Sequence, residues 1–87
     1  MARHELLIKP SARRELERIR DGRAQDAVIA AIRCLAHDPR PSGCQKLVGG
    51  DRLYRIRVGV YRVIYEVLDR QLIVTVIRVG HRRDVYR

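Results

Sequence analysis

The chain has 87 residues, 46% of them hydrophobic, which suits one small domain over residues 1–87 and excludes a disordered protein. The net charge is +9, and residues 46–87 hold ten basic and four acidic residues, so this half is expected to face an anionic partner. Two cysteines, three scattered histidines, no signal-peptide pattern and no long apolar run predict a cytoplasmic protein with no metal, no cofactor and no membrane contact.

The start of the chain is predicted to form a strand and then a helix. Residues 4–9, HELLIK, have the pattern of a short strand. Pro10 suits the first turn of a helix and Ser11 suits its cap. Over residues 12–20 the apolar side chains recur at helical spacing and form one stripe.

A second helix is predicted over residues 24–37. Asp21 and Gly22 interrupt the first helix, and the apolar positions that follow form a wide stripe, as in a helix that packs on a sheet. Residues 38–43 contain two prolines and a glycine and are predicted to form a loop.

From residue 53 the hydrophobic period changes to two, which predicts strands over 53–58, 60–68 and 71–79. The joins at 59–60 and 69–70 are short enough for hairpins, and Gly59 suits a type II′ turn, which requires a positive φ. The expected fold class is α+β: a strand, a helical hairpin and a three-stranded antiparallel meander. Two helices would pack on one face of a twisted, mostly antiparallel sheet of about four strands.

Three arginines share one face of this predicted sheet. A two-residue turn at 59–60 places Arg57 opposite Arg62, and Arg55 points to the same side. This face is either solvated and partly neutralised by Glu66, or it binds an anion. Guanidinium groups match phosphate oxygens and stay charged, and three of them suit a polyanion, so nucleic acid is the leading partner.

The end of the chain adds five candidates: His81, Arg82, Arg83, Tyr86 and Arg87. Taken alone, this is an ordinary basic tail. Beside the arginine face, however, it is predicted to form one wall of a cationic groove, and the arginine face is predicted to form the other wall. Tyr86 would stack on a base and His81 would exchange protons near neutral pH.

Two segments, KLVGGDRLYRIRVGVYRVIYEV over 46–67 and VIRVGHRRDVYR over 76–87, resemble the RelE/ParE superfamily of bacterial toxins, and RelE-type members most closely. The shared pattern is KL-x-G, Y-[KR]-I-[KR], Y-R-[VL]-[VI]-Y and G-[HK]-R…VY, in this order. The resemblance implies the RelE-like fold and a toxin of a type II toxin–antitoxin system.

RelE-type toxins are ribosome-dependent endoribonucleases that cut messenger RNA in the ribosomal A site. The resemblance therefore implies the 70S ribosome, mRNA and a cognate antitoxin as partners, with a monomeric free toxin and a hetero-oligomeric toxin–antitoxin complex. The implied reaction is attack of a ribose 2′-OH on the adjacent phosphodiester. It requires a base, cations at the phosphorane and a donor for the leaving oxygen, but no metal.

The resemblance also implies roles for single residues. Arg55 and Arg62 would stabilise the phosphate, Arg82 would serve the leaving oxygen, and Tyr86 would orient the base. Further RNA contacts are expected from the basic residues Lys46, Arg52, Arg83 and Arg87.

One position departs from the family. RelE members have Lys where this chain has Arg57, and that lysine is assigned as the general base. A guanidinium does not give up its proton at physiological pH. Either Arg57 acts by electrostatics alone, or another group takes the proton. His81 and Glu66 are the candidates, and His81 is the better one because related toxins use a histidine near the C-terminus.

Three questions stay open at this point. Some relatives carry a further C-terminal helix over the active site, whereas here the groove is expected to stay open or to be covered by an antitoxin helix. A ParE-type toxin shares the fold but poisons DNA gyrase, and a non-catalytic RNA-binding protein is a third alternative. RNA cleavage is favoured because the whole set of family positions is present: Arg55, Arg57, Arg62, Arg82 and Tyr86.

Overall fold

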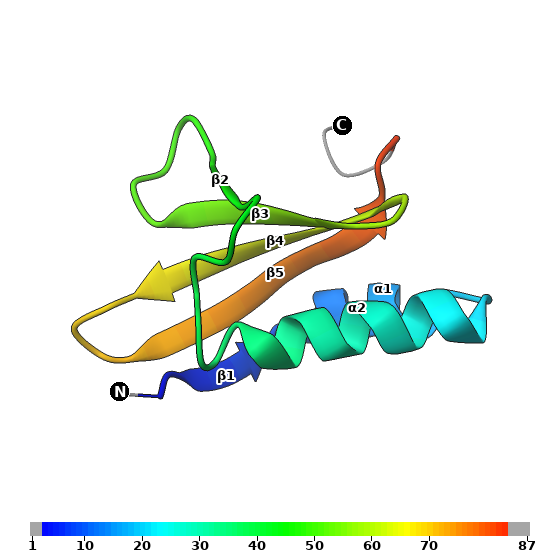
Figure 1. The fold of residues 1–87 in the computed structure, drawn as a ribbon, viewed down its shortest axis with the longest axis horizontal. Coiled ribbons are helices and arrows are strands. Elements are labelled where there is room, and N and C mark those ends of the chain that lie inside the picture. Colours follow the sequence, from blue (N-terminus) through cyan, green and yellow to red (C-terminus); the bar gives the residue numbers. More distant parts are fainter. Residues whose placement is uncertain (1–2, 84–87) are drawn as a thin grey trace.

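A computed structural model of the chain describes residues 3–83. Its elements, in chain order, are β1 (Glu5–Ile8), α1 (Pro10–Glu17), α2 (Gly22–Cys34), β2 (Gln45–Lys46), β3 (Leu53–Val58), β4 (Tyr61–Leu68) and β5 (Ile73–His81) (Figure 1). The described strands form one five-stranded sheet in the order β1-β5-β4-β3-β2. The pairing of β1 with β5 is parallel, and the other pairs are antiparallel.

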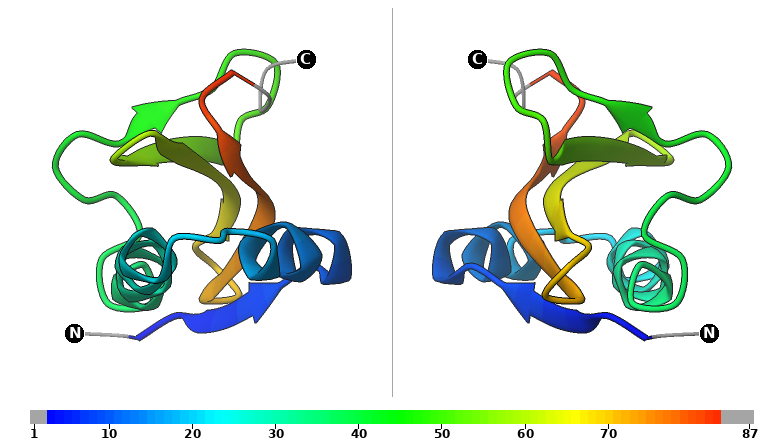
Figure 2. Two further views of the ribbon diagram at one scale, coloured as in Figure 1. Left: turned by 90° about the vertical axis from the view of Figure 1, so that its right-hand side faces the viewer. Right: turned by 90° about the vertical axis from the view of Figure 1, so that its left-hand side faces the viewer.

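The α+β prediction is confirmed, but the sheet has one strand more than expected. The additional strand is β2, which pairs with Tyr54 and Arg55 at the edge of β3. A strand of only two residues has no hydrophobic period, so the sequence pattern does not reveal it. The sheet is strongly twisted and curves around the helices (Figure 2). Within residues 3–83, neither helix is long and apolar enough to cross a membrane.

Helix α1 begins at Pro10, in agreement with the prediction, but it ends early, and α2 both begins and ends before the predicted residues. The cap of α1 is Lys9, without a side-chain hydrogen bond, so Ser11 is not the cap residue. The helix ends at Glu17 rather than at residue 20. For α2, the Asp21 carboxylate accepts the N–H groups of Arg23 (2.9 Å) and Ala24 (3.3 Å). The aspartate that was expected only to break the first helix therefore starts the second one, which ends before residue 35.

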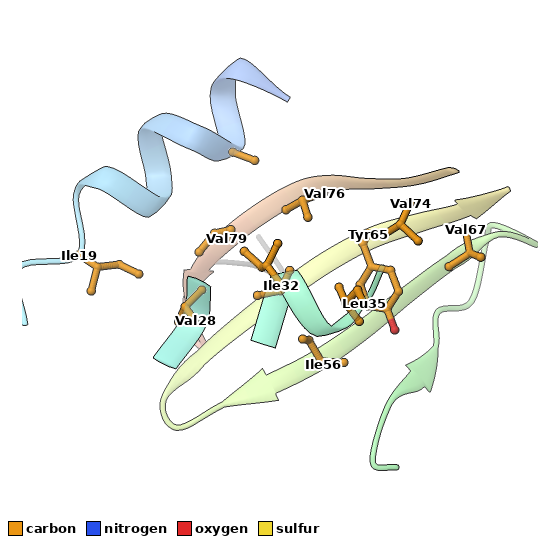
Figure 3. Close-up of a cluster of buried hydrophobic side chains, with 12 residues drawn as sticks. Ile19, Val28, Ile32, Leu35, Ile56, Tyr65, Val67, Val74, Val76 and Val79 are labelled. Carbon is orange, nitrogen blue, oxygen red and sulfur yellow. The ribbon is translucent and has the colours of Figure 1, made fainter. Parts of the chain in front are cut away.

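The helical hairpin and one face of the sheet enclose a single core (Figure 3). On β3 and β4 the face opposite the three arginines points inward, because its alternate residues are buried or pack against buried ones. The core residues are Ala12, Ile19, Val28, Ile32, Leu35, Ile56, Val63, Tyr65, Val67, Val74, Val76 and Val79. The opposite face of the sheet carries Arg57, Arg62 and Glu66 together with apolar side chains such as Ile64 and Leu68.

An irregularity in β5 adjusts its pattern to this core. Ile64 pairs with Arg78 and Tyr65 pairs with Val76, so Ile77 has no partner on β4. One inserted residue shifts the alternation of a strand by one position. As a result, both Val76 and Val79 are buried although they lie three residues apart.

Helix α1 completes the outer edge of β5. The pairing with β1 ends at Val76. Beyond that point, Glu15 of α1 accepts the backbone N–H of Val79 (2.9 Å) and the Nε–H of Arg78 (3.3 Å). A helix side chain thus satisfies an edge donor that would otherwise be open to another chain.

Candidate nucleic-acid interface

The turn between β3 and β4 positions the arginines. Gly59 has φ +62°, as the predicted turn requires, and Val58 pairs with Tyr61 across it. The next pair is Arg57 with Arg62, as predicted. Arg55 lies two residues before Arg57, so it is on the same face of the sheet. We call Arg55, Arg57 and Arg62 the arginine cluster.

The three members of the arginine cluster differ in exposure. Arg57 is exposed, Arg62 is half-buried, and Arg55 is 7% exposed. The expectation that all three lie on an open face is therefore wrong for Arg55. Its Nη2 donates to Oε1 of Gln45 on β2, the strand that the sequence pattern did not reveal. Such a charge-assisted bond stabilises the guanidinium and fixes its orientation.

The last residues of β5 also lie at this end of the sheet, but they are on different faces of it. Gly80 is opposite Arg62, whereas His81 is opposite Tyr61, with its ring centroid 6.1 Å from that of the tyrosine. Because Tyr61 packs against the core, His81 lies on the helix side of the sheet and not on the side of the arginine cluster. The Nδ1 atom of His81 accepts the N–H of Arg83 (3.2 Å).

Arg82 is held close to the β3–β4 turn. Its backbone N–H donates to the carbonyl oxygen of Val60 (2.8 Å), and its side chain and that of Arg83 are exposed. Tyr86 and Arg87 lie outside the described residues, so their predicted contacts with RNA stay predictions.

The structure separates the remaining predicted residues from the arginine cluster. Lys46 is opposite Tyr54 and so belongs to the helix-facing side of the sheet. The backbone oxygen of Arg52 accepts the N–H of Val67 (2.9 Å) near the far end of β4. Glu66 is opposite Leu53, four residues along β4 from Arg62, and no ion pair of Glu66 is found among residues 3–83.

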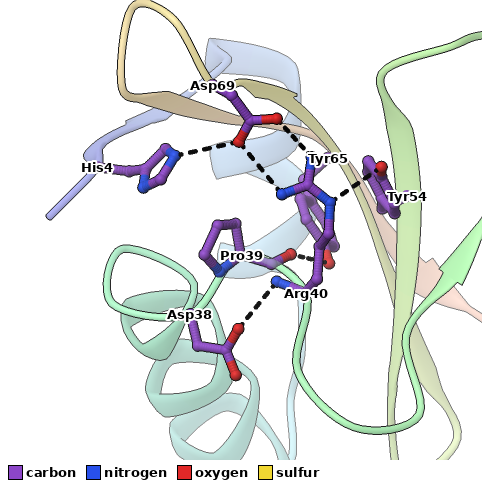
Figure 4. Close-up of polar contacts among 7 residues, drawn as sticks. All are labelled: His4, Asp38, Pro39, Arg40, Tyr54, Tyr65 and Asp69. Atoms are coloured by element: carbon purple, nitrogen blue, oxygen red, sulfur yellow. Dashed lines mark hydrogen bonds and ion pairs between the residues drawn. The ribbon is translucent and has the colours of Figure 1, made fainter. Parts of the chain in front are cut away.

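A polar network that the sequence pattern did not predict lies at that far end (Figure 4). Nη1 and Nη2 of Arg40 donate to the two carboxylate oxygens of Asp69 (3.2 and 2.7 Å), and Nε donates to the hydroxyl of Tyr54 (3.1 Å). The guanidinium carbon is 4.9 Å from the centre of the Tyr54 ring.

Two further residues join these contacts. Nε2 of His4 is 3.6 Å from the Asp69 carboxylate. Tyr65 donates to the carbonyl oxygen of Pro39 (2.7 Å). We call these contacts the Arg40 network.

Charge and burial in the Arg40 network shift three titrations. The hydrogen bond from Arg40 holds the pKa of Asp69 below its ordinary value, and the hydrogen bond to Asp69 raises the pKa of Arg40. Burial raises the pKa of the Tyr65 phenol. At neutral pH the network therefore consists of a charged pair and a neutral buried phenol.

No metal centre is formed by the described residues. Within residues 3–83, no three histidine, cysteine, aspartate or glutamate side chains come together as metal ligands would.

Comparison with known proteins identifies the family. The profile of the ParE toxin of the type II toxin–antitoxin system parDE matches residues 6–86, which is nearly the whole chain. This chain belongs to the ParE toxin family. It is a type II toxin with the fold of the RelE/ParE superfamily. A search of the curated proteins found no match.

Solved toxin structures have the same fold. A mutant of the E. coli toxin RelE in the free state is 25% identical, with a TM-score of 0.78, and the match covers 99% of this chain and 90% of RelE. The archaeal RelE–RelB complex from Pyrococcus horikoshii OT3 matches with 23% identity and a TM-score of 0.81, over 98% and 100% of the two chains. The YoeB/ParE toxin from Agrobacterium tumefaciens matches with 21% identity and a TM-score of 0.73, over 88% and 96%.

Proposed function

We propose that this toxin is a metal-independent endoribonuclease that cuts mRNA in the A site of the 70S ribosome and so inhibits translation. The observation that carries the proposal is the arginine cluster. It places an exposed, a half-buried and a buried guanidinium on one face of two paired strands, with Arg57 directly opposite Arg62. Like charges in this position destabilise a sheet, so a polyanionic ligand gives them a physical reason to be there.

The proposed chemistry is transesterification. The ribose 2′-oxygen attacks the adjacent phosphorus, the bond to the 5′-oxygen breaks, and the products are a 2′,3′-cyclic phosphate and a free 5′-hydroxyl. Negative charge grows on the phosphorane oxygens, and Arg55 and Arg62 would stabilise it. The hydrogen bond to Gln45 keeps Arg55 in place before the substrate arrives, which reduces the reorganisation needed during the reaction.

Proton transfer is assigned separately. Arg57 would act by electrostatics, since a guanidinium is not a base at physiological pH. His81 lies at the same end of the sheet as the cluster, since it follows Gly80, which is opposite Arg62, although its ring is on the side of Tyr61. Glu66 is on the side of the cluster but four residues further along β4, toward the far end. We therefore propose His81 for proton transfer to or from the reacting oxygens, with Arg82 and Tyr86 at the leaving group and the base. Arg83 and Arg87 would contact the RNA backbone, together with the more distant Lys46 and Arg52.

The proposed partners follow from charge as well as family. A domain of net charge +9 attracts an acidic or amphipathic segment, and the antitoxin is proposed to supply one. Solved relatives include toxin–antitoxin complexes such as the intact E. coli RelBE complex. We propose a cytoplasmic toxin that is monomeric when free and hetero-oligomeric with its antitoxin.

The decisive experiment compares ribosome-bound and free RNA. Purified toxin is added to mRNA on bacterial ribosomes with an empty A site, and to the same RNA alone, and the new 5′ ends are mapped by primer extension. Cuts in the A-site codon that appear only with ribosomes are the expected result. Growth arrest by a toxin that cuts neither sample would overturn the proposal.

A second candidate function is inhibition of DNA gyrase. The observation in its favour is the match to the ParE toxin profile over residues 6–86. The two functions are separated by a supercoiling assay with purified gyrase. Inhibition of supercoiling that persists after substitution of Arg57 and Arg62, without any RNA cleavage, would support gyrase as the target.

A further inference from the structure

A cavity of about 550 Å³ lies at the edge of β3, next to the arginine cluster. Among the described strands, β2 pairs only with Tyr54 and Arg55, so the edge of β3 from Ile56 onwards has no neighbouring strand. The cavity occupies this place. Its walls come from the end of α2, the loop over residues 41–43, Gln45 and β3.

The walls of this cavity have two different chemistries. Ala31 of α2 and Ile56 of β3 are apolar, and Cys34 lies beside them at the end of the helix. Arg55 and Arg57 supply the cationic part of the lining. The volume is within the usual range of small-ligand sites, roughly 300–1,000 Å³.

We propose that this cavity holds one nucleobase of the RNA, next to the phosphate bound by the arginine cluster, and so contributes to the choice of the sequence that is cut. This inference rests on the proposed function. A nucleotide carries an anionic phosphate and a flat, largely apolar base, and both parts find a matching wall here. The oxygen of the Gln45 amide is bonded to Arg55, so its NH₂ group supplies the donors for the edge of a base.

A nucleobase fits the cavity better than an extended peptide that adds a strand to β3. The two-residue turn makes Val58 and Tyr61 a hydrogen-bonded pair, so only Arg57 directs its backbone groups to the open part of the edge before the turn. A strand added there would gain few main-chain hydrogen bonds, which are the main source of affinity in this binding mode.

The first test is a titration of the whole chain followed by two-dimensional ¹⁵N NMR. The ligands are the four ribonucleoside 5′-monophosphates and ribose 5-phosphate, which has the phosphate but no base. Nucleotides are expected to shift the amide signals of Ala31, Cys34 and Ile56, and ribose 5-phosphate is not. Equal shifts of these signals by both kinds of ligand would overturn the proposal, because the phosphate alone would then explain binding.

The second test fills the cavity without changing an arginine. Cys34→Phe adds a large side chain to the cavity lining, and Ala30→Phe adds the same side chain to an exposed position on α2 that is outside it. Cys34→Phe is expected to weaken nucleotide binding at least tenfold and to change the distribution of A-site cuts, whereas Ala30→Phe changes neither. Unchanged binding and unchanged cutting by Cys34→Phe would refute the cavity as a base site.

The outcomes separate this inference from the proposed function. If the wild-type toxin cuts no RNA, the proposed function fails, and the NMR titration still decides whether the cavity takes a base. If RNA is cut normally but no nucleotide shifts the cavity signals, the proposed function stands and the base site is wrong. Shifts caused by an extended acidic peptide, and by no nucleotide, would assign the edge of β3 to a protein partner instead.

Discussion

The two ends of β4 use arginine in opposite ways. At the far end, Arg40 is paired with Asp69 through both carboxylate oxygens, bonded to Tyr54 and stacked over its ring. At the turn end, Arg57 is exposed, is opposite another arginine, and has no carboxylate partner among residues 3–83. The charge of Arg40 is therefore balanced by Asp69 within the fold, whereas the charge of Arg57 is available to a ligand.

This difference separates stability from function along a single strand. The Arg40 network joins four parts of the chain: the residue before β1, the loop after α2, β3, and the turn after β4 (Figure 4). The arginine cluster joins only neighbouring strands and adds like charges to them. Substitutions at the far end are therefore expected to change the free energy of unfolding, and substitutions at the turn end are expected to change RNA cleavage.

The largest expected effect is at the turn end. Arg57→Gln is expected to lower the rate of A-site cleavage by about 10²-fold, because it removes a cation that stabilises the negative charge developing on the phosphorane oxygens. The free energy of unfolding should change by less than about 0.5 kcal/mol, since Arg57 is exposed. Primer extension and urea titration measure the two effects. The matched control is Arg70→Gln at the far end, and an equal loss of cleavage there would mean that only net charge matters.

Tyr65→Phe is the next largest change, and it acts on stability. It removes the hydrogen bond to the carbonyl of Pro39 and should cost about 1 kcal/mol at pH 7, as measured by urea unfolding. The raised pKa of Tyr65 means that the protonated phenol stabilises the fold fully below pH 10 and progressively less above it. The advantage of the wild type over Tyr65→Phe should therefore shrink in alkali. A difference that grows above pH 10 would contradict this assignment.

Arg40→Ala should have a smaller effect, because both members of the pair with Asp69 are largely exposed. Loss of the ion pair and of the stacking on Tyr54 is expected to cost under about 1 kcal/mol. Arg40→Lys keeps the charge but loses the planar fork, so its stability should lie between those of Arg40→Ala and the wild type. RNA cleavage by both variants should match the wild type, and a large loss would remove the functional distinction between the two ends.

The smallest expected effect is the acid dependence that comes from Asp69. The hydrogen bond from Arg40 lowers the pKa of Asp69 from 3.8, so its contribution to stability is present above pH 3.8 and is lost as the pH falls through the lower folded value. Asp69→Asn should remove this contribution, so its unfolding midpoint should fall less than that of the wild type between pH 5 and pH 2. Identical acid profiles would show that the pair adds no stability.

Local pattern was sufficient for the predictions that depend on neighbouring residues. The period of two fixed β3 to β5 within a few residues, and the turn at Gly59 fixed the register of Arg57 and Arg62. The turn at 69–70 was less accurate, because Leu68 pairs with Ile73 and the connection spans residues 69–72. Leu72 there has φ +57°, a conformation that its residue type gives no reason to expect.

Sequence alone determined the class of fold, the family motifs and the arginine-rich face, because each depends on spacing within one hairpin or one helix. Tertiary structure alone decided that β2 covers Arg55, that His81 lies on the side of Tyr61, that Glu15 closes the edge of β5, and that Arg40 meets Asp69. These contacts join residues 10 to 64 positions apart in the chain. They depend on how the sheet twists and where the helical hairpin lies against it, and no local period carries that information.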